Sequence, residues 1–166
     1  MAVLNTDIKY YLSGGAANSD PAASIGGAIS SVEVTPSTLW DDVGSDEASA
    51  GDVEYRCIYV KNTSGTDTLL SAKAWVPTNT PSTSTTVDIA LGAAAVSATE
   101  TAVANESTAP SGPTFSAPGD KATGLTIGDL AAGAYKAIWV RRTVTAGAGA
   151  YNNDGYTLSV GGDTGA

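Results

Sequence analysis

The sequence has no histidine and a single cysteine, Cys57, among its 166 residues. The absence of histidine excludes Ser-His-Asp and Cys-His catalytic arrangements, imidazole bases and most zinc sites. One cysteine cannot form a disulfide within the chain or a thiolate metal cluster, and in mid-strand it is expected to pack as a small apolar residue. We therefore predict that the protein is not an enzyme and uses no cofactor or metal.

Positive charge is also scarce. Eight basic against 17 acidic residues give a net charge of −9 at pH 7, which argues against binding to a nucleic-acid backbone. No apolar run approaches the roughly 18 residues of a membrane span, and the N-terminal residues lack the basic start and cleavage site of a signal peptide. We expect synthesis in the cytoplasm and neither nucleic acid nor a membrane as a partner.

Large side chains are few, because half of the residues are Ala, Gly, Ser or Thr and only 7% are aromatic. The large apolar residues alternate with smaller or polar ones over short stretches, at 4–12, 70–76, 87–91 and 156–160. Alternation with a period of two, interrupted by Gly, Pro and Asn clusters, is typical of short β-strands. The sequence predicts an all-β fold over 1–166, a single β-sandwich domain, with a jelly roll or a small barrel as the alternative.

Two long segments, 16–50 and 92–120, are poor in large apolar residues. Long structureless loops are uncommon in compact domains, so these segments indicate a functional or partner contact. We expect residues 1–50 to be partly an extended arm and 92–120 to be a long irregular connection. The two segments are either long connections of the domain or arms that need a neighbouring subunit to become ordered. The sequence LAAGAY at 130–135 resembles the tyrosine corner of immunoglobulin-like and fibronectin-like sandwiches, which favours that type of β-sandwich.

One segment occurs twice, as YRCIYVKNT at 55–63 and as YKAIWVRRT at 135–143. The middle of each copy is apolar on both faces of a strand, so something other than water should cover both faces. One interpretation makes the copies the central strands of the two sheets, with the long connections over their outer faces and the basic residues at solvated rims. The other adds that their aromatic and basic residues form a partner-binding surface, because such residues often anchor interfaces.

The repeated segments contain five of the eight basic residues, which gives an acidic molecule an oriented electrostatic face. The interface candidates are the aromatic and basic residues of these segments and two tyrosines of the first expected strand: Tyr55, Arg56, Tyr59, Lys61, Tyr135, Lys136, Trp139, Arg141, Arg142, Tyr10 and Tyr11.

Carboxylates gather in one stretch, at Asp41, Asp42, Asp46, Glu47 and Asp52. They lack the alternating spacing and the closing Glu of a calcium loop. We interpret the stretch as a solvated acidic loop, with weak cation binding as the alternative.

Three blocks of sequence are recognisable: DIKYYLSGGAANSDPAASIGGAISS, LWDDVGSDEASAGDVEYRCIYVKNTSG and GAYKAIWVRRTVTAGAGAYNNDGYTLSVGGD. Together they resemble a group of small virion structural proteins of tailed bacteriophages, and they cover well over half of the chain. Residues 80–125 carry no such resemblance. It implies a structural protein that is made in the host bacterial cytoplasm, often takes a β-sandwich form and relies on neighbouring subunits to order its arms, and it assigns no functional residues.

These observations lead us to expect a capsid decoration or cement protein on the outer capsid surface. Its partners would be the major capsid protein or other virion subunits, and it could itself form a homo-oligomer. The alternative is a tail, baseplate or receptor-binding module of the virion. A third possibility, of another class, is a carbohydrate-binding or carbohydrate-degrading module that stacks sugars on aromatic rings, the candidates being Trp40, Trp75, Tyr151 and Tyr156.

Overall fold

A computed structural model of the protein describes residues 2–151 and 154–164. The strands in this part of the chain are β1 (Ile8–Ser13), β2 (Ile29–Glu33), β3 (Asp52–Asn62), β4 (Leu69–Thr78), β5 (Thr85–Leu91), β6 (Leu125–Leu130), β7 (Tyr135–Val144) and β8 (Thr157–Thr164). The helical elements are the α-helix α1 (Ser45–Ala50) and the 3₁₀ turns η1 (Asn5–Asp7), η2 (Pro21–Ala23) and η3 (Pro36–Thr38).

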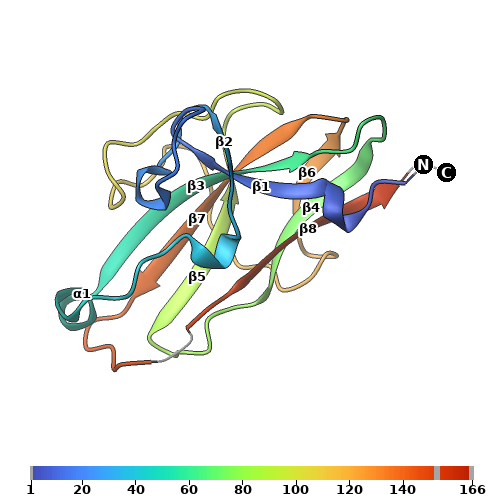
Figure 1. The fold of residues 1–166 in the computed structure, drawn as a ribbon. Coiled ribbons are helices and arrows are strands. Elements are labelled where there is room, and N and C mark those ends of the chain that lie inside the picture. Colours follow the sequence, from blue (N-terminus) through green and yellow to red (C-terminus); the bar gives the residue numbers. More distant parts are fainter. Residues whose placement is uncertain (1, 152–153, 165–166) are drawn as a thin grey trace.

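The strands form two antiparallel sheets (Figure 1). The large sheet has the order β2-β1-β3-β7-β5 and the small sheet the order β6-β4-β8. The predicted all-β architecture is therefore confirmed. The two sheets by themselves do not confirm the finer immunoglobulin-like assignment, because β2 gives the large sheet a fifth strand that an immunoglobulin constant domain lacks.

The tyrosine corner is not reproduced either. Tyr135 opens β7 directly after the turn that follows β6, as the motif requires. Its ring packs edge-on against Tyr59, with 5.4 Å between the ring centroids. Within the described residues the Tyr135 hydroxyl forms no hydrogen bond, whereas a corner tyrosine bonds back to the upstream backbone.

Most strands lie where the alternating pattern predicts them, as β4, β5 and β8 show. The N-terminal strand begins later than expected, at Ile8, because the preceding residues close into a 3₁₀ turn. In that turn the amide of Leu4 donates to the carboxylate of Asp7 (2.8 Å). The pattern did not predict β2, β6 or α1, which are five or six residues long; such short elements leave little periodicity to detect.

The two copies of the repeated segment lie side by side in the large sheet as β3 and β7, so the prediction that each occupies a different sheet is wrong. Ile58 lies opposite Ile138, the same position of the repeat, which relates the two copies by a local twofold. This register places the small Cys57 opposite Trp139, and Tyr59 opposite the small Ala137. The antiparallel pairing of the two copies therefore places a small residue opposite each of these two aromatic rings.

The physical reason for their location is that only the large sheet is covered on both faces. Its inner face packs against the small sheet and forms the main hydrophobic core, which includes Ile58, Val60, Ile138 and Val140. The outward side of the small sheet carries exposed or half-buried residues, such as Ser71 and Lys73. A strand that is apolar on both faces therefore fits only the middle of the large sheet.

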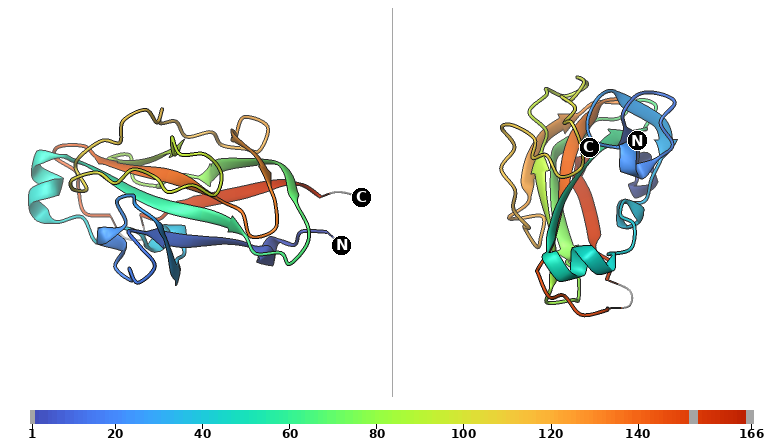
Figure 2. Two further views of the ribbon diagram at one scale, coloured as in Figure 1. Left: turned by 90° about the horizontal axis from the view of Figure 1, so that it is seen from above. Right: turned by 90° about the vertical axis from the view of Figure 1, so that its left-hand side faces the viewer.

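A cover made of residues 14–28 and 92–120 lies over the outer face of the large sheet, and Figure 2 (left) shows the yellow and gold segment 92–120 running along it. Beneath the cover is a second apolar cluster, which includes Cys57, Tyr59 and Trp139 and contacts Phe115 of the cover. The prediction that the long connections cover the outer face of these strands is confirmed.

The cover belongs to the same chain that it packs on. In segment 92–120, the amide of Gly92 donates to the carbonyl of Ala137 (2.9 Å), and the carbonyl of Glu106 accepts from the amide of Tyr55 (2.7 Å). Segment 92–120 is irregular, as predicted, but it does not extend away as an arm. Residues 1–50 supply β1 and β2 to the large sheet, so only part of that stretch lacks regular structure.

The two halves of the cover meet at Gly26. The amide of Gly27 donates to the carbonyl of Glu100, and that of Val103 to the carbonyl of Ile25, both at 2.9 Å. Gly26 has a φ of +99°, and a Cβ atom there would lie 2.5 Å from the carbonyl oxygen of Thr101. Only glycine fits this contact.

We predict that Gly26→Ala lowers the free energy of unfolding by about 1 kcal/mol or more, because it combines a positive φ with a clash. It should also accelerate labelling of the buried Cys57 by a thiol reagent, because the cover above it loosens. Urea unfolding and labelling kinetics measure both effects. Gly119→Ala is the matched control in the same cover, since a Cβ there meets no atom within 4 Å. Equal effects of the two substitutions would contradict the proposed role of Gly26.

Candidate functional site

The structure buries five of the predicted interface residues: Tyr55, Arg56, Tyr59, Trp139 and Arg142. The cover shields the rings on the outer face of the large sheet, and the packing of the inner face shields the two guanidinium groups. These side chains cannot contact a partner in this conformation, so the prediction that they form a docking face is corrected. They hold the sheet and its cover together instead.

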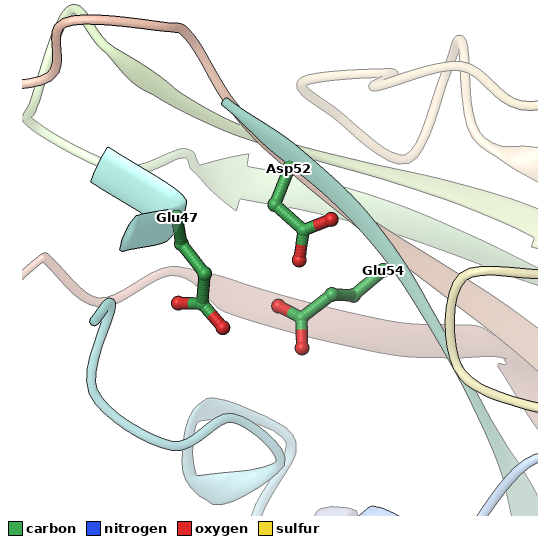
Figure 3. A group of neighbouring side chains, drawn as sticks. All are labelled: Glu47, Asp52 and Glu54. Atoms are coloured by element: carbon green, nitrogen blue, oxygen red, sulfur yellow. The ribbon is translucent and has the colours of Figure 1, made fainter. Parts of the chain in front are cut away.

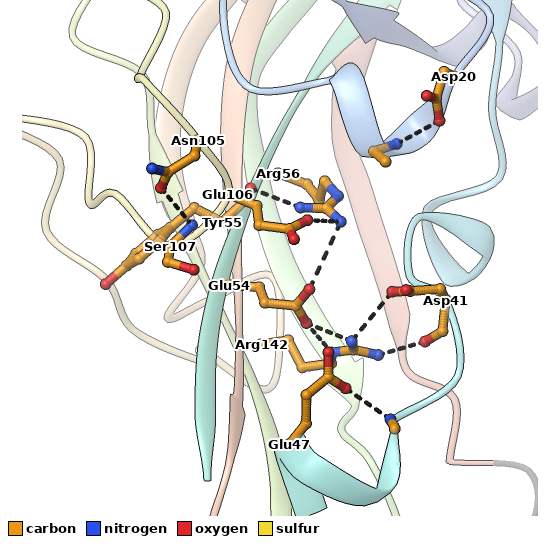
Figure 4. Close-up of polar contacts among 12 residues, drawn as sticks. Asp20, Asp41, Glu47, Glu54, Tyr55, Arg56, Asn105, Glu106, Ser107 and Arg142 are labelled. Carbon is orange, nitrogen blue, oxygen red and sulfur yellow. Dashed lines mark hydrogen bonds and ion pairs between the residues drawn. The ribbon is translucent and has the colours of Figure 1, made fainter. Parts of the chain in front are cut away.

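The two buried arginines belong to one ion-pair network with Glu54 at its centre (Figure 4). Arg142 Nε donates to Glu54 Oε2 (2.6 Å), and Arg56 Nη2 lies 3.7 Å from Glu54 Oε1. Arg56 Nη2 also pairs with Glu106 of the cover at 2.5 Å. Burial raises the pKa of Glu54, and the neighbouring guanidinium groups act in the opposite direction. The expectation of solvated basic rims is therefore wrong for these two arginines.

Trp40 completes the network from the segment between η3 and α1. The guanidinium carbons of Arg56 and Arg142 lie 5.1 and 5.0 Å from the centroid of its ring. Such contacts are attractive because the ring carries negative charge on its face, and more so when water is excluded. Arg142 Nη1 also donates to the carbonyl of Asp41 (2.7 Å), which attaches this segment to β7.

Three carboxylates converge where α1 meets β3 (Figure 3). Glu47, Asp52 and Glu54 offer oxygen atoms that all lie within 4.8 Å of one another. Glu47 and Asp52 belong to the acidic stretch of the sequence, whereas Glu54 lies outside it, directly before the repeated segment, and was not predicted as part of the group. The guanidinium of Arg142 already neutralises Glu54, and Glu47 accepts the amide of Gly44 (2.8 Å) at the start of α1. These two interactions give Glu54 and Glu47 structural roles, in joining β3 to β7 and in capping the start of α1.

Four of the remaining candidates are engaged within the chain. Tyr10 donates through its hydroxyl to the carbonyl of Leu158 (3.3 Å), and Tyr135 packs on Tyr59. Lys136 donates to the carbonyl of Ala94 in the cover.

Arg141, the fourth, is also held against the cover. It pairs with Asp88 at 2.6 Å and lies over the ring of Phe115, with its guanidinium carbon 4.9 Å from the ring centroid.

Lys61 and Tyr11 lie together on the outer face of β3 and β1, with Lys61 Nζ 5.8 Å from the Tyr11 ring centroid. Lys9 faces Lys61 across the strands and pairs with Glu33 at 2.7 Å. We call Lys9, Tyr11 and Lys61 the basic patch. Lys9 was not among the predicted interface residues, because only the strand register brings it next to the repeated segment.

No protein-family model, curated protein or solved structure matches the chain. In the described part of the chain, none of the helices combines the length and the apolar composition that crossing a bilayer requires.

We predict that Glu54→Gln lowers the free energy of unfolding by about 3 kcal/mol or more, because it leaves buried guanidinium charge uncompensated. The matched control is Glu33→Gln, which breaks the exposed pair with Lys9 and should change stability little. Urea unfolding at low and high salt measures both variants. If the two variants lost similar unfolding free energy, burial of Glu54 would not be the cause. The same would follow if high salt abolished the loss caused by Glu54→Gln.

We predict that Tyr59→Phe destabilises the protein by about 1 to 3 kcal/mol, because two buried partners lose their hydrogen bonds. The Tyr59 hydroxyl donates to the carbonyl of Gly27 (2.6 Å) and accepts from the amide of Glu100 (2.8 Å), one from each half of the cover. Loss of stability by chemical denaturation, with Cys57 labelling accelerated, is the expected result; unchanged stability would argue against this bridge.

The same tyrosine makes stability depend on alkaline pH. Burial raises the pKa of Tyr59 from 10.0 to about 12. The unfolded state then loses its phenolic proton first, so the contribution of Tyr59 is complete below pH 10 and is lost as pH rises towards 12. We expect the stability difference between the natural protein and Tyr59→Phe to shrink over that interval. A constant difference in urea unfolding across it would be the contrary result.

Proposed function

We propose that the protein is a non-enzymatic structural component of a tailed-phage particle, a decoration protein that binds the outer surface of the capsid. The resemblance of the three sequence blocks suggests the setting. The observation that supports the docking role is the basic patch. Its Tyr11 and Lys61 belong to the predicted aromatic and basic face and remain accessible in the structure. Its partner would be the major capsid protein or another virion subunit.

The electrostatics of the patch favour an acidic partner surface. The molecule carries a net charge of −9, which discourages non-specific association with other acidic surfaces. Glu33 pairs with Lys9, so the positive charge left to the patch is that of Lys61, which lies beside Tyr11 and would attract a negative partner in one orientation. Tyr11 lies beside Lys61, with 5.8 Å between Lys61 Nζ and the ring centroid, and supplies an aromatic anchor of the kind found at interface centres.

The rest of the described surface offers little apolar area for docking. Its exposed large apolar residues are scattered along the chain: Leu4, Val43, Val53, Val96 and Tyr151. A stable contact typically buries roughly 800 Å² on each partner, so polar and charged surface around the patch has to contribute. Binding of this kind should weaken as salt rises.

The proposal predicts that the double substitution Lys9→Glu with Lys61→Glu weakens binding to particles stripped of this protein by about tenfold or more. The control reverses the same amount of charge at Lys73 on the small sheet and at Lys121 in the turn before β6. Sedimentation with particles at several salt concentrations measures the binding.

Copy number in purified particles tests the location. Many copies per particle, measured by gel densitometry or mass spectrometry, are expected for a decoration protein. A few copies would favour the tail, baseplate or receptor-binding role instead, and absence from particles would remove both.

A further inference from the structure

A cleft of about 760 Å³ lies at the α1 end of the molecule. Its described lining comes from the segment between η3 and α1, from β5 and β7, and from the segment that leads into β8. This volume falls in the range of small-molecule sites, which is roughly 300 to 1,000 Å³. The basic patch belongs to the opposite end, because α1 precedes the first residue of β3 whereas Lys61 is near its last.

Three of the four aromatic residues considered as sugar-stacking candidates line this cleft: Trp40, Tyr151 and Tyr156. More than a hundred residues of sequence separate Trp40 from the two tyrosines, so only the fold brings them together. The fourth, Trp75, lies elsewhere, on β4 against Gly161 of β8. Their convergence in one cleft is the observation on which the inference rests.

The three rings have different parts in the cleft. Tyr156 is buried and its hydroxyl donates to the carbonyl of Pro36 (2.6 Å), so it is a fixed part of the wall. Trp40 is held by the guanidinium groups of Arg56 and Arg142. Tyr151 is 54% exposed and offers an accessible ring at the rim. A rigid wall with one accessible ring suits the flat, apolar side of a sugar.

The polar lining combines carboxylates with hydroxyl groups, the latter from Ser37, Ser45, Thr80 and Thr85. Asp41 and Asp42 carry exposed carboxylates, and Asp154 accepts the amide of Ser82 (2.9 Å). Arg142 also lines the cleft, but its charge is neutralised by Glu54. Carboxylates accept hydrogen bonds from hydroxyl groups, whereas their negative charge repels phosphates, sulfates and acidic sugars.

We infer that this cleft binds a neutral saccharide, with a sugar ring on Tyr151 and its hydroxyl groups donating to Asp41 and Asp42. The hydrogen bond from Arg142 to the Asp41 carbonyl fixes the segment that carries both carboxylates, so these acceptors are in place before the ligand arrives. The inference goes beyond the proposed docking function and does not rest on it. Binding is proposed here without cleavage of the sugar.

The test begins with a glycan array of neutral and acidic saccharides. It continues with calorimetric titration of cellotriose, maltotriose and triacetylchitotriose at millimolar concentrations, with 3′-sialyllactose as the acidic probe. We expect neutral saccharides to bind and the acidic probe not to bind. Tyr151→Ala and Asp42→Asn, both at exposed positions, should each weaken binding by about tenfold, the effect of losing one stacking or charged hydrogen-bond contact.

Trp75→Ala is the matched aromatic control and should leave saccharide binding unchanged; Trp75→Phe replaces it if the alanine variant fails to fold by circular dichroism. The Lys9→Glu, Lys61→Glu protein should also bind saccharides normally, which separates this inference from the docking proposal. The inference is overturned if no neutral saccharide binds on the array or in titration, if acidic saccharides bind more tightly, or if Trp75 matters as much as Tyr151.

Discussion

The structure depends on one constraint: β3 and β7 are apolar on both faces, so the sheet that holds them must be shielded from water on both sides. The small sheet shields one face, and the cover shields the other. Burial of apolar area at about 25 cal/mol per Å² is the main favourable contribution to folding. A long connection with few large residues can therefore be ordered by the sheet beneath it, without a neighbouring subunit.

The same constraint decides where the charges lie. Arg56 and Arg142 belong to strands that are covered on both faces, so they need partners inside the protein, which Glu54, Glu106 and the ring of Trp40 provide. An interior ion pair is maintained only when its hydrogen bonds are satisfied. The sequence alone assigns Arg56 and Arg142 to a binding surface. In the structure their ion pairs and hydrogen bonds connect β3, β7, the cover and the segment before α1 instead.

The basic patch and the cleft lie at opposite ends of β3. An 11-residue strand spans roughly 35 Å, so a partner at the basic patch and a ligand in the cleft would not obstruct one another. A particle component attached through the basic patch would present the cleft away from its attachment. This arrangement unites the proposed docking role with the inferred saccharide site in one molecule.

The sequence by itself determined the all-β class, most strand positions, and the need for shielding on both faces of the repeated segments, because these follow from local alternation of side chains. It did not determine the pairing of β3 with β7, the twofold match of Tyr59 with Ala137, or the enclosure of Arg56. Those depend on strand register and on contacts between residues distant in the chain. The meeting of Lys9 with Lys61, and of Trp40 with Tyr151, was decided only by the tertiary structure for the same reason.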